Sequence, residues 1–363
     1  MWVPLKNEQI CTDSRGVNGK STQGRFFEDF SLGETIQHAT PRTITTGDAA
    51  LYTALTGTRF ALQSSDVFAR RVGLRRAPVD NLLAFHIAFG KTVPDISLNA
   101  VANLGYAECR FLAPIYPEDT IAVASDVIGL KQNRDGRNGI VYVRSKAVNQ
   151  HREPVLSWVR WVMVEKRDPD SPAPEPLVPD LADAVVDLAI PDGLDARGWN
   201  DMQAGSADRW ENYSAGERID HLAGVTVENT EHGLAARLYQ NNARVHFNAQ
   251  RAHGTRFGQR VVYGGHIMSL ARALSHNGLA NACLIAAING GTHANPVFAG
   301  DTIYAWTEVI AAHPLPARSD LGALRLCTRA TKDLPCADFP KAGPRVVLDL
   351  DYTVLMPRRL EPR

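Results

Sequence analysis

The sequence predicts an α+β protein built from two similar domains. Residues 26–38 (FFEDFSLGETIQH) return 183 positions later as residues 209–221 (RWENYSAGERIDH), and each copy continues with a long apolar helix and alternating strands. This period is far longer than the roughly 20–50 residues of a solenoid repeat. The chain length of 363 residues also fits about two domains. We therefore expect a duplicated domain.

Each copy shows the same order of elements. A short strand (residues 34–38 and 217–221) precedes an apolar-periodic helix (residues 47–55 and 231–239). After an irregular loop comes a long apolar helix, NLLAFHIAFG in the first copy and HIMSLARALS in the second. A helix followed by antiparallel strands predicts a sheet with one face packed on the helix. The strands are expected where β-branched and aromatic residues alternate, at residues 139–150, 155–166, 323–332 and 346–356.

The expected organisation has four parts. A flexible leader (residues 1–24) precedes the first domain (residues 25–167), and a connecting segment (residues 168–208) leads to the second domain (residues 209–358). The connecting segment begins DPDSPAPEPLVPD, and its proline and acidic residues disfavour regular structure. The leader is polar and lacks the apolar core of a signal peptide.

Composition argues against several classes of partner. The 39 basic and 39 acidic residues balance, so neither nucleic acid nor an anionic membrane is expected as a partner. No apolar stretch approaches the ~20 residues of a membrane span. The five cysteines form no C-x-x-C pair, which favours a reducing, cytoplasmic location. His246, His253 and His266 have no carboxylate or cysteine at ligand spacing, so no metal is expected.

The two copies differ most in the segment after their first helix. The first copy reads LYTALTGTRFALQSSD and the second reads LAARLYQNNARVHFNA. Among these side chains, an imidazole titrates near neutrality, whereas hydroxyls and amides do not. We therefore expect the chemistry in the second copy, with the first copy completing the sheet and shaping the substrate groove. The repeat pairs Thr58 with Asn241, Gln63 with His246, and Ser65 with Asn248.

The segment YQNNARVHFN (residues 239–248) and the downstream turn YGGH (residues 263–266) resemble the (R)-specific enoyl-CoA hydratases, or MaoC-like dehydratases. That family carries S-G-D-x-N-P-L-H-x-D, followed by an A-H-G turn that opens a helix. The resemblance implies a double hotdog fold, in which two antiparallel sheets each wrap around a long central helix. RFLAPIYPEDT (residues 110–120) and NPVFAGDT (residues 295–302) resemble the family's strand before its P-G-D-T turn.

Longer strings resemble the mesaconyl-CoA hydratases, also called β-methylmalyl-CoA dehydratases. The resemblance covers residues 25–358 and implies a hydro-lyase that reversibly hydrates mesaconyl-CoA in glyoxylate assimilation. It implies no cofactor, since CoA is part of the substrate, and a homo-oligomer, with a dimer favoured. A hydratase for another 2-enoyl-CoA, a thioesterase and a non-catalytic acyl-CoA-binding protein stay open as alternatives. The strings include VPDISLNAVANLGYAE, RLYQNNARVHFN, VVYGGHIMSLARALS and LCTRATKDLPCADFP.

Hydration of an α,β-unsaturated thioester needs a group that activates water and returns a proton to Cα. It also needs donors that hold the enolate-like oxygen. His246 is expected to be the acid/base, and Asn241 to orient the water. The N–H groups of Gly264 and Gly265, at a helix start, suit the oxyanion. Tyr263 and His266 are expected to line the pocket.

Two positions depart from the family pattern. Asn241 stands where the family has an aspartate, and an amide cannot act as a base. Either His246 performs both proton transfers, or a carboxylate comes from elsewhere, with Asp80 and Glu231 as candidates. Arg244 replaces the family's proline, and we expect it to bind the free carboxylate of a mesaconyl group. A surface position or a contact with a CoA phosphate is the alternative for Arg244.

Overall fold

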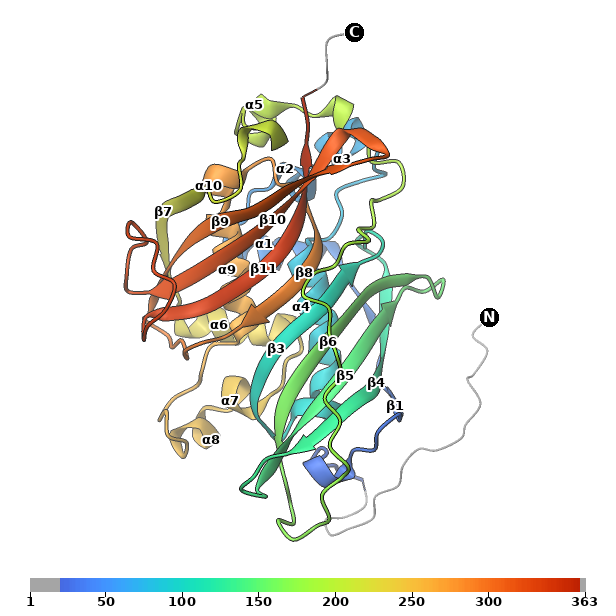
Figure 1. The fold of residues 1–363 in the computed structure, drawn as a ribbon, viewed down its shortest axis with the longest axis vertical. Coiled ribbons are helices and arrows are strands. Elements are labelled where there is room, and N and C mark those ends of the chain that lie inside the picture. Colours follow the sequence, from blue (N-terminus) through green and yellow to red (C-terminus); the bar gives the residue numbers. More distant parts are fainter. Residues whose placement is uncertain (1–19, 360–363) are drawn as a thin grey trace.

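Residues 20–359 are described by a computed structural model in which a curved antiparallel sheet of eleven strands encloses two central helices (Figure 1). The strand order is β1-β4-β5-β6-β3-β8-β11-β10-β9-β7, and β2 pairs with β4. The two halves of the sheet repeat the same relative order, which confirms the α+β class. Most of the predicted leader lies outside the described residues.

The first half of the chain supplies the strands on one side of the sheet and the helix α4. The helices α1 to α3 precede α4 in the chain. The elements are β1 (Thr35–Gln37), β2 (Arg42–Thr43), α1 (Thr46–Thr56), α2 (Ala61–Ser64), α3 (Asp66–Arg71), α4 (Asn81–Thr92), β3 (Ala100–Phe111), β4 (Thr120–Gln132), β5 (Asn138–Val148) and β6 (Pro154–Glu165).

The second half repeats this arrangement after the short helix α5 (Asp201–Ala204) of the connecting segment. Its central helix is α9. The elements are β7 (Arg218–Thr226), α6 (Asn229–Leu238), α7 (Arg244–Phe247), α8 (Ala249–His253), α9 (Gly264–Leu274), α10 (His276–Leu279), β8 (Leu284–Thr292), β9 (Thr302–Leu315), β10 (Arg318–Lys332) and β11 (Val346–Pro357).

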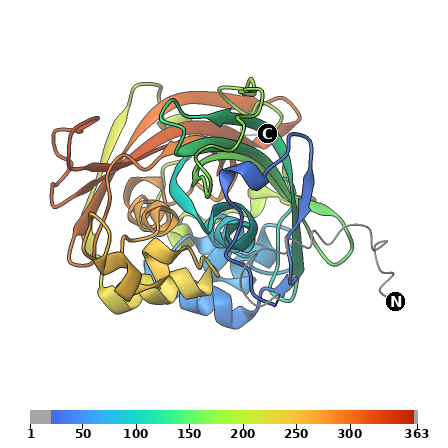
Figure 2. The same ribbon diagram turned by 90° about the horizontal axis from the view of Figure 1, so that it is seen from below.

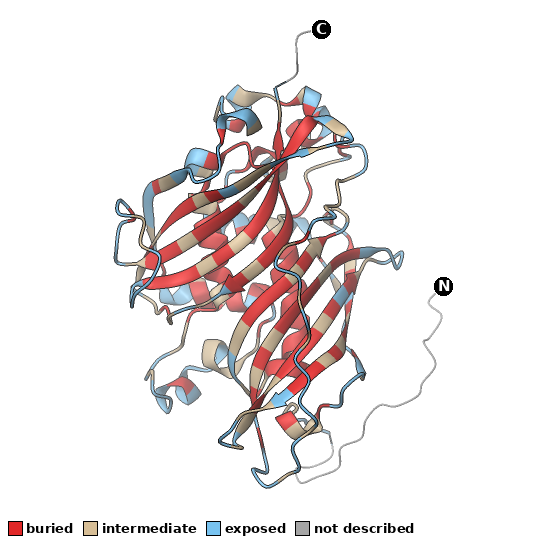
Figure 3. Cartoon of the chain, viewed as in Figure 1, coloured by how far each residue is buried: buried red, intermediate tan, exposed pale blue. Residues whose placement is uncertain are grey.

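The two expected sheets are joined through their edge strands. Strand β3 pairs antiparallel with β8, with Tyr106 opposite Gly291 and Cys109 opposite Ile288, so one continuous sheet crosses both halves. Figure 3 shows that the strands on both sides of this junction are largely buried, whereas exposed residues gather in the loops. The junction places side chains of β3 beside elements of the second half.

The helices α4 and α9 lie side by side inside the curved sheet (Figure 2). Residues Leu82 to Thr92 of α4 are all buried, as expected for a helix that is apolar on every face. The two helices meet where His86 Nε2 lies 3.0 Å from Ser269 Oγ. These residues are 183 positions apart, so they are equivalent in the two copies. An approximate twofold axis therefore passes between the two central helices.

The histidines that match in the repeat, His38 and His221, belong to buried hydrogen-bond networks. His38 Nε2 lies 2.7 Å from Ser125 Oγ, and His221 Nε2 lies 2.8 Å from Thr307 Oγ1. Burial lowers the pKa of both imidazoles, that of His221 to about 4. Both are therefore neutral at pH 7. These two histidines, which match in the repeat, stabilise the fold.

The strings RFLAPIYPEDT and NPVFAGDT are mostly loops, so their expected strand character is wrong. In the first string β3 ends at Phe111 and β4 begins at Thr120. In the second, β9 begins only at Thr302. Prolines explain the difference, because they cannot donate a hydrogen bond to a neighbouring strand.

The connecting segment is irregular over most of its length, as predicted, but its end is firmly packed. The ring of Trp199 meets Phe68 edge to face, with a centroid distance of 4.8 Å, and its Nε1–H donates to Asn281 Oδ1 at 2.9 Å. Leu194, Ala196 and Ala204 are buried in the same apolar cluster. No helix within residues 20–359 combines the length and apolarity needed to cross a bilayer.

Candidate active site

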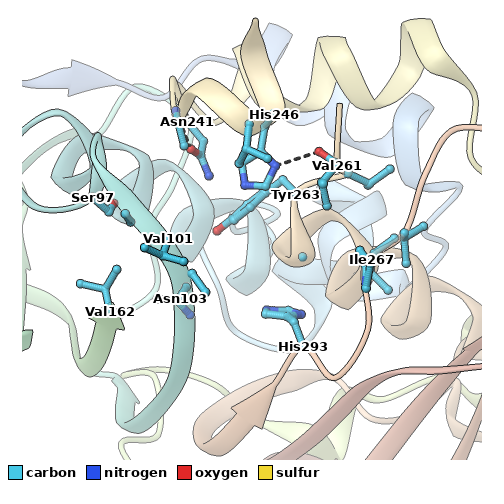
Figure 4. A pocket seen from close by; sticks show the side chains of 18 of the residues that line it. Ser97, Val101, Asn103, Val162, Asn241, His246, Val261, Tyr263, Ile267 and His293 are labelled. Carbon is cyan, nitrogen blue, oxygen red and sulfur yellow. Dashed lines mark hydrogen bonds between the residues drawn. The ribbon is translucent and has the colours of Figure 1, made fainter. Parts of the chain in front are cut away.

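A cavity of about 290 Å³ lies between the two halves of the chain. Figure 4 shows His246 and Asn241 on one side of it, His293 and Ile267 on another, and Val101, Asn103 and Val162 on a third. The second half contributes Asn241, Val245, His246, Tyr263, Gly264, Ile267 and His293, and the first half contributes Phe89, Ser97, Asn103, Tyr106, Arg160 and Val162, among others.

His246 lies on the short helix α7 and presents a defined tautomer. Its Nδ1 is 2.8 Å from the carbonyl oxygen of Val261. A carbonyl can only accept, so Nδ1 carries the hydrogen and Nε2 keeps its lone pair. Burial lowers the pKa of His246, against the opposing effect of the Val261 carbonyl. The imidazole is therefore neutral at pH 7 and able to take a proton through Nε2.

Asn241 is 2% exposed and faces the same cavity. Its Oδ1 accepts a hydrogen bond of 3.2 Å from the backbone N–H of Ala243, and within residues 20–359 its amide N–H groups have no acceptor, so they can act as donors. Gly90 of α4 allows the loop to approach, because a Cβ there would lie 1.8 Å from the carbonyl oxygen of Tyr239. The fold therefore places an amide donor next to a neutral imidazole.

The helix α9 begins at the cavity with two glycines that leave no room for a side chain. A Cβ on Gly264 would lie 2.5 Å from atoms of the His293 ring, and one on Gly265 would lie 2.4 Å from the Tyr263 ring. Within residues 20–359 their N–H groups have no hydrogen-bond acceptor, as is usual at a helix start. Tyr263 and Gly264 line the cavity, whereas Gly265 packs behind Tyr263.

His293 is a cavity residue that the sequence analysis missed. Its Nε2 lies 3.1 Å from the hydroxyl of Tyr106, on the strand from the other half. Burial and the nearby His246 lower its pKa to about 4, so it is neutral at pH 7. The signal was present in the repeat, because RFLAPIYPEDTI aligned with THANPVFAGDTI places Phe111 opposite His293.

Neither candidate carboxylate reaches His246. Asp80 caps α4, where its Oδ1 accepts from the N–H of Leu82 at 2.8 Å. Glu231 Oε1 lies 3.5 Å from Nε2 of His266 instead. Within the described part of the chain no aspartate or glutamate oxygen lies within 4.0 Å of a His246 ring nitrogen.

Arg244 and His266 lie outside the cavity. The Arg244 guanidinium donates to Asn99 Oδ1 at 2.7 Å and to the carbonyl oxygen of Gln23 at 3.2 Å, which ties α7 to the first half. His266 is fully buried on α9, beside Glu231. The sequence-predicted residues that the structure brings together are therefore His246, Asn241, Tyr263 and Gly264, which all line the cavity.

The equivalent place in the first copy is built for packing. Gln63, the counterpart of His246, donates through Nε2 to the carbonyl oxygen of Cys283 at 2.8 Å. Ser65 caps α3 as Asn248 caps α8. Thr58 is buried, and its hydroxyl has no partner in the described residues. The apolar cluster around Trp199 covers α2 and α3.

Comparison with known proteins gives a consistent family. Residues 15–333 match the model of the mesaconyl-CoA hydratases. The chain is 62% identical to a β-methylmalyl-CoA dehydratase of Chloroflexus aurantiacus over 351 residues, which are 94% of this chain and 100% of that protein. It is 56% identical to a mesaconyl-CoA hydratase of Cereibacter sphaeroides over 346 residues, 93% of this chain and 100% of that protein.

Solved structures agree with the fold. A putative MaoC domain protein dehydratase from Chloroflexus aurantiacus superposes with a TM-score of 0.92 at 62% identity, covering 94% of this chain and 99% of the other. A Mycobacterium tuberculosis protein with a double hotdog fold gives a TM-score of 0.75 at 25% identity, covering 92% and 98%. The family match over most of the chain and the full-length relatives show that this chain belongs to the mesaconyl-CoA hydratase family.

Proposed function

We propose that this chain reversibly hydrates mesaconyl-CoA to β-methylmalyl-CoA. The observation that carries the proposal is the full-length identity of 62% and 56% to two proteins named for the two directions of this reaction. The cavity between the halves supports it, because it holds a neutral imidazole, an amide donor and a helix start. The substrate carries its own CoA, so the proposed reaction needs no further cofactor.

In the proposed mechanism His246 serves as both base and acid. Nε2 takes a proton from water while the water oxygen bonds to Cβ and the double-bond electrons move toward the thioester oxygen. The protonated imidazole then returns that proton to Cα as the enolate collapses. The Val261 carbonyl holds the Nδ1 hydrogen throughout, so the ring keeps one orientation. Because a single group on one face of the double bond transfers both protons, we expect the hydroxyl group and the hydrogen to add to the same face.

Asn241 and the start of α9 stabilise the reacting atoms in this proposal. The free amide N–H of Asn241 orients the water for attack, a role that needs no change of charge. The N–H of Gly264 lies at the N-terminal end of α9, which favours an anion, and binds the enolate-like oxygen. Oxyanion donors of this kind contribute roughly 10²–10³ in rate.

A panel of enoyl-CoA thioesters tests the proposal. The loss of conjugated absorbance is followed for mesaconyl-CoA, crotonyl-CoA and a longer 2-enoyl-CoA, and free thiol is measured in parallel. We expect the highest kcat/KM with mesaconyl-CoA and no release of CoA. A preference for crotonyl-CoA would indicate a different hydratase, and thiol release would indicate a thioesterase. The same preparation, measured by light scattering, tests the expected homodimer.

A further inference from the structure

The inward face of β6 carries one charge where its pattern calls for an apolar residue. Trp158, Val162 and Val164 alternate along this face and are fully buried. Arg160 lies between them with an exposed fraction of 0%. Burying a guanidinium costs several kcal/mol unless a counter-charge or a full set of hydrogen bonds compensates. A buried arginine inside an apolar stripe therefore calls for a partner.

The described residues give Arg160 no such partner. Its Nη2 donates to Thr92 Oγ1 at 2.9 Å, and Nη1 and Nη2 donate to Ser97 Oγ at 3.3 Å each. Its Nε has no acceptor, and within residues 20–359 no carboxylate oxygen lies within 4.0 Å. The guanidinium lies over the ring of Phe89, at 4.2 Å from its centroid. Burial lowers the pKa of Arg160 to about 10, so the group is still charged at pH 7.

Arg160 belongs to the same cavity as His246. Both residues line it, and Arg160 donates to Ser97, which Figure 4 shows in the cavity wall together with Val162. Tyr106 sits directly opposite Arg160 on β3, and its hydroxyl reaches His293. One tyrosine therefore lies opposite Arg160 in the strand pair and contacts the His293 imidazole.

Asn103 and Ser97, which line the cavity with Arg160, also have polar groups without a hydrogen-bond partner in the described residues. Asn103 has both side-chain polar atoms buried without a hydrogen-bond partner in the described residues. Ser97 accepts from Arg160, so its own hydroxyl hydrogen is available to an acceptor. A guanidinium, an amide N–H and a hydroxyl facing one cavity form a site for an anion with two oxygens.

From this arrangement we infer that Arg160, with Ser97 and Asn103, binds a carboxylate on the acyl group of the substrate and selects dicarboxylic over simple 2-enoyl thioesters. The inference rests on the proposed function and names the specificity-determining residue of that site. Arg244, which the sequence suggested for this task, is instead bound to Asn99 and Gln23 outside the cavity.

The test compares two thioesters that differ in one group. Mesaconyl-CoA and tiglyl-CoA share the 2-methyl-2-enoyl skeleton, and a methyl replaces the carboxylate in the second. We expect R160M to lose about 100-fold or more in kcat/KM with mesaconyl-CoA while tiglyl-CoA changes by less than about threefold. R160K, which keeps the charge without the planar fork, should fall between the wild type and R160M. Equal losses with both thioesters would overturn the inference.

A matched arginine controls for packing. Arg272 is 5% exposed and stacks on Phe60 at 3.6 Å, away from the cavity. R272M should therefore change kcat/KM for both thioesters by the same factor, because it acts only through the stability of the protein. Thermal unfolding of R160M should match or exceed the wild type, because the change removes a buried charge without a counter-ion.

Binding to the wild-type protein gives a second readout that needs no variant. Methylsuccinyl-CoA and 2-methylbutyryl-CoA are unreactive saturated counterparts of the two thioesters. We expect the first to bind at least about tenfold more tightly by calorimetry, and equal affinities would overturn the inference. A wild-type protein that binds methylsuccinyl-CoA selectively but does not hydrate mesaconyl-CoA would refute the proposed function and leave the carboxylate site standing.

Discussion

Replacing Gly264 by alanine tests whether the start of α9 and His293 form one tightly fitted wall. A Cβ at Gly264 would lie 2.5 Å from Cε1 and Nδ1 of His293 and 2.6 Å from its Cγ. Ordinary carbon contacts are about 3.5 Å, so the helix start or the imidazole must move by roughly 1 Å. Overpacking of this kind costs about 1–3 kcal/mol, and a 1 Å misplacement in an active site costs about 100-fold in rate.

The assay measures kcat/KM with mesaconyl-CoA and thermal unfolding for G264A, H293A and the double variant. We expect G264A to lower both quantities and to cost less stability when His293 is also truncated, since the clash then disappears. G47A is the matched control, because Gly47 is exposed on α1 with only Thr45 Oγ1 at 3.4 Å from the added Cβ. Alanine there should leave stability equal or higher. A fully active G264A variant would refute the reasoning. So would an equal loss of stability from G264A in the protein that also carries H293A.

Three further predictions follow from burial and hydrogen bonding. The free energy of unfolding should fall as the pH drops from about 6.5 toward 4, because buried histidines such as His221 (pKa about 4) stay neutral in the folded protein and bind a proton in the unfolded chain. His221 alone accounts for roughly 3 kcal/mol of this loss. A free energy of unfolding, measured by denaturant titration, that does not change with pH would contradict this prediction. N241A should lower kcat by roughly 10²-fold with little change in unfolding temperature, and unchanged turnover would rule out a water-orienting amide. W199A should destabilise the protein by about 3–5 kcal/mol in chemical denaturation, whereas a freely mobile connecting segment would give almost none.

The repeat predicted the architecture because it marks positions that the fold needs twice. His38 and His221 occupy matching networks, and Ser65 and Asn248 cap matching helices. Helix periodicity placed α4 and α9 within two residues at their starts, since both are strongly apolar. The pairing of β3 with β8 was not predictable from the repeat, because it depends on how the two copies pack against each other.

The site was only partly predictable for a similar reason. The difference between the copies singled out His246 and Asn241, and the same comparison at Phe111 would have added His293. Arg160 carries no such mark, because an arginine in an alternating strand usually faces solvent, and only the structure shows that its face is the buried one. Arg244 was suggested because it replaces the family's proline, and His266 because it belongs to the YGGH turn. In the structure Arg244 binds Asn99 on the first half, and His266 lies on a buried face of α9 beside Glu231.

The central claim is that the His246 imidazole transfers the proton in hydration. Single-turnover hydration of mesaconyl-CoA is compared for the wild type, H246Q and H253Q, with the affinity of methylsuccinyl-CoA measured for each. His253 lies exposed on α8 and serves as the control. The account predicts that H246Q loses about 10²–10⁴-fold in rate while binding changes little and H253Q behaves as the wild type. An H246Q protein that hydrates within tenfold of the wild-type rate would contradict it.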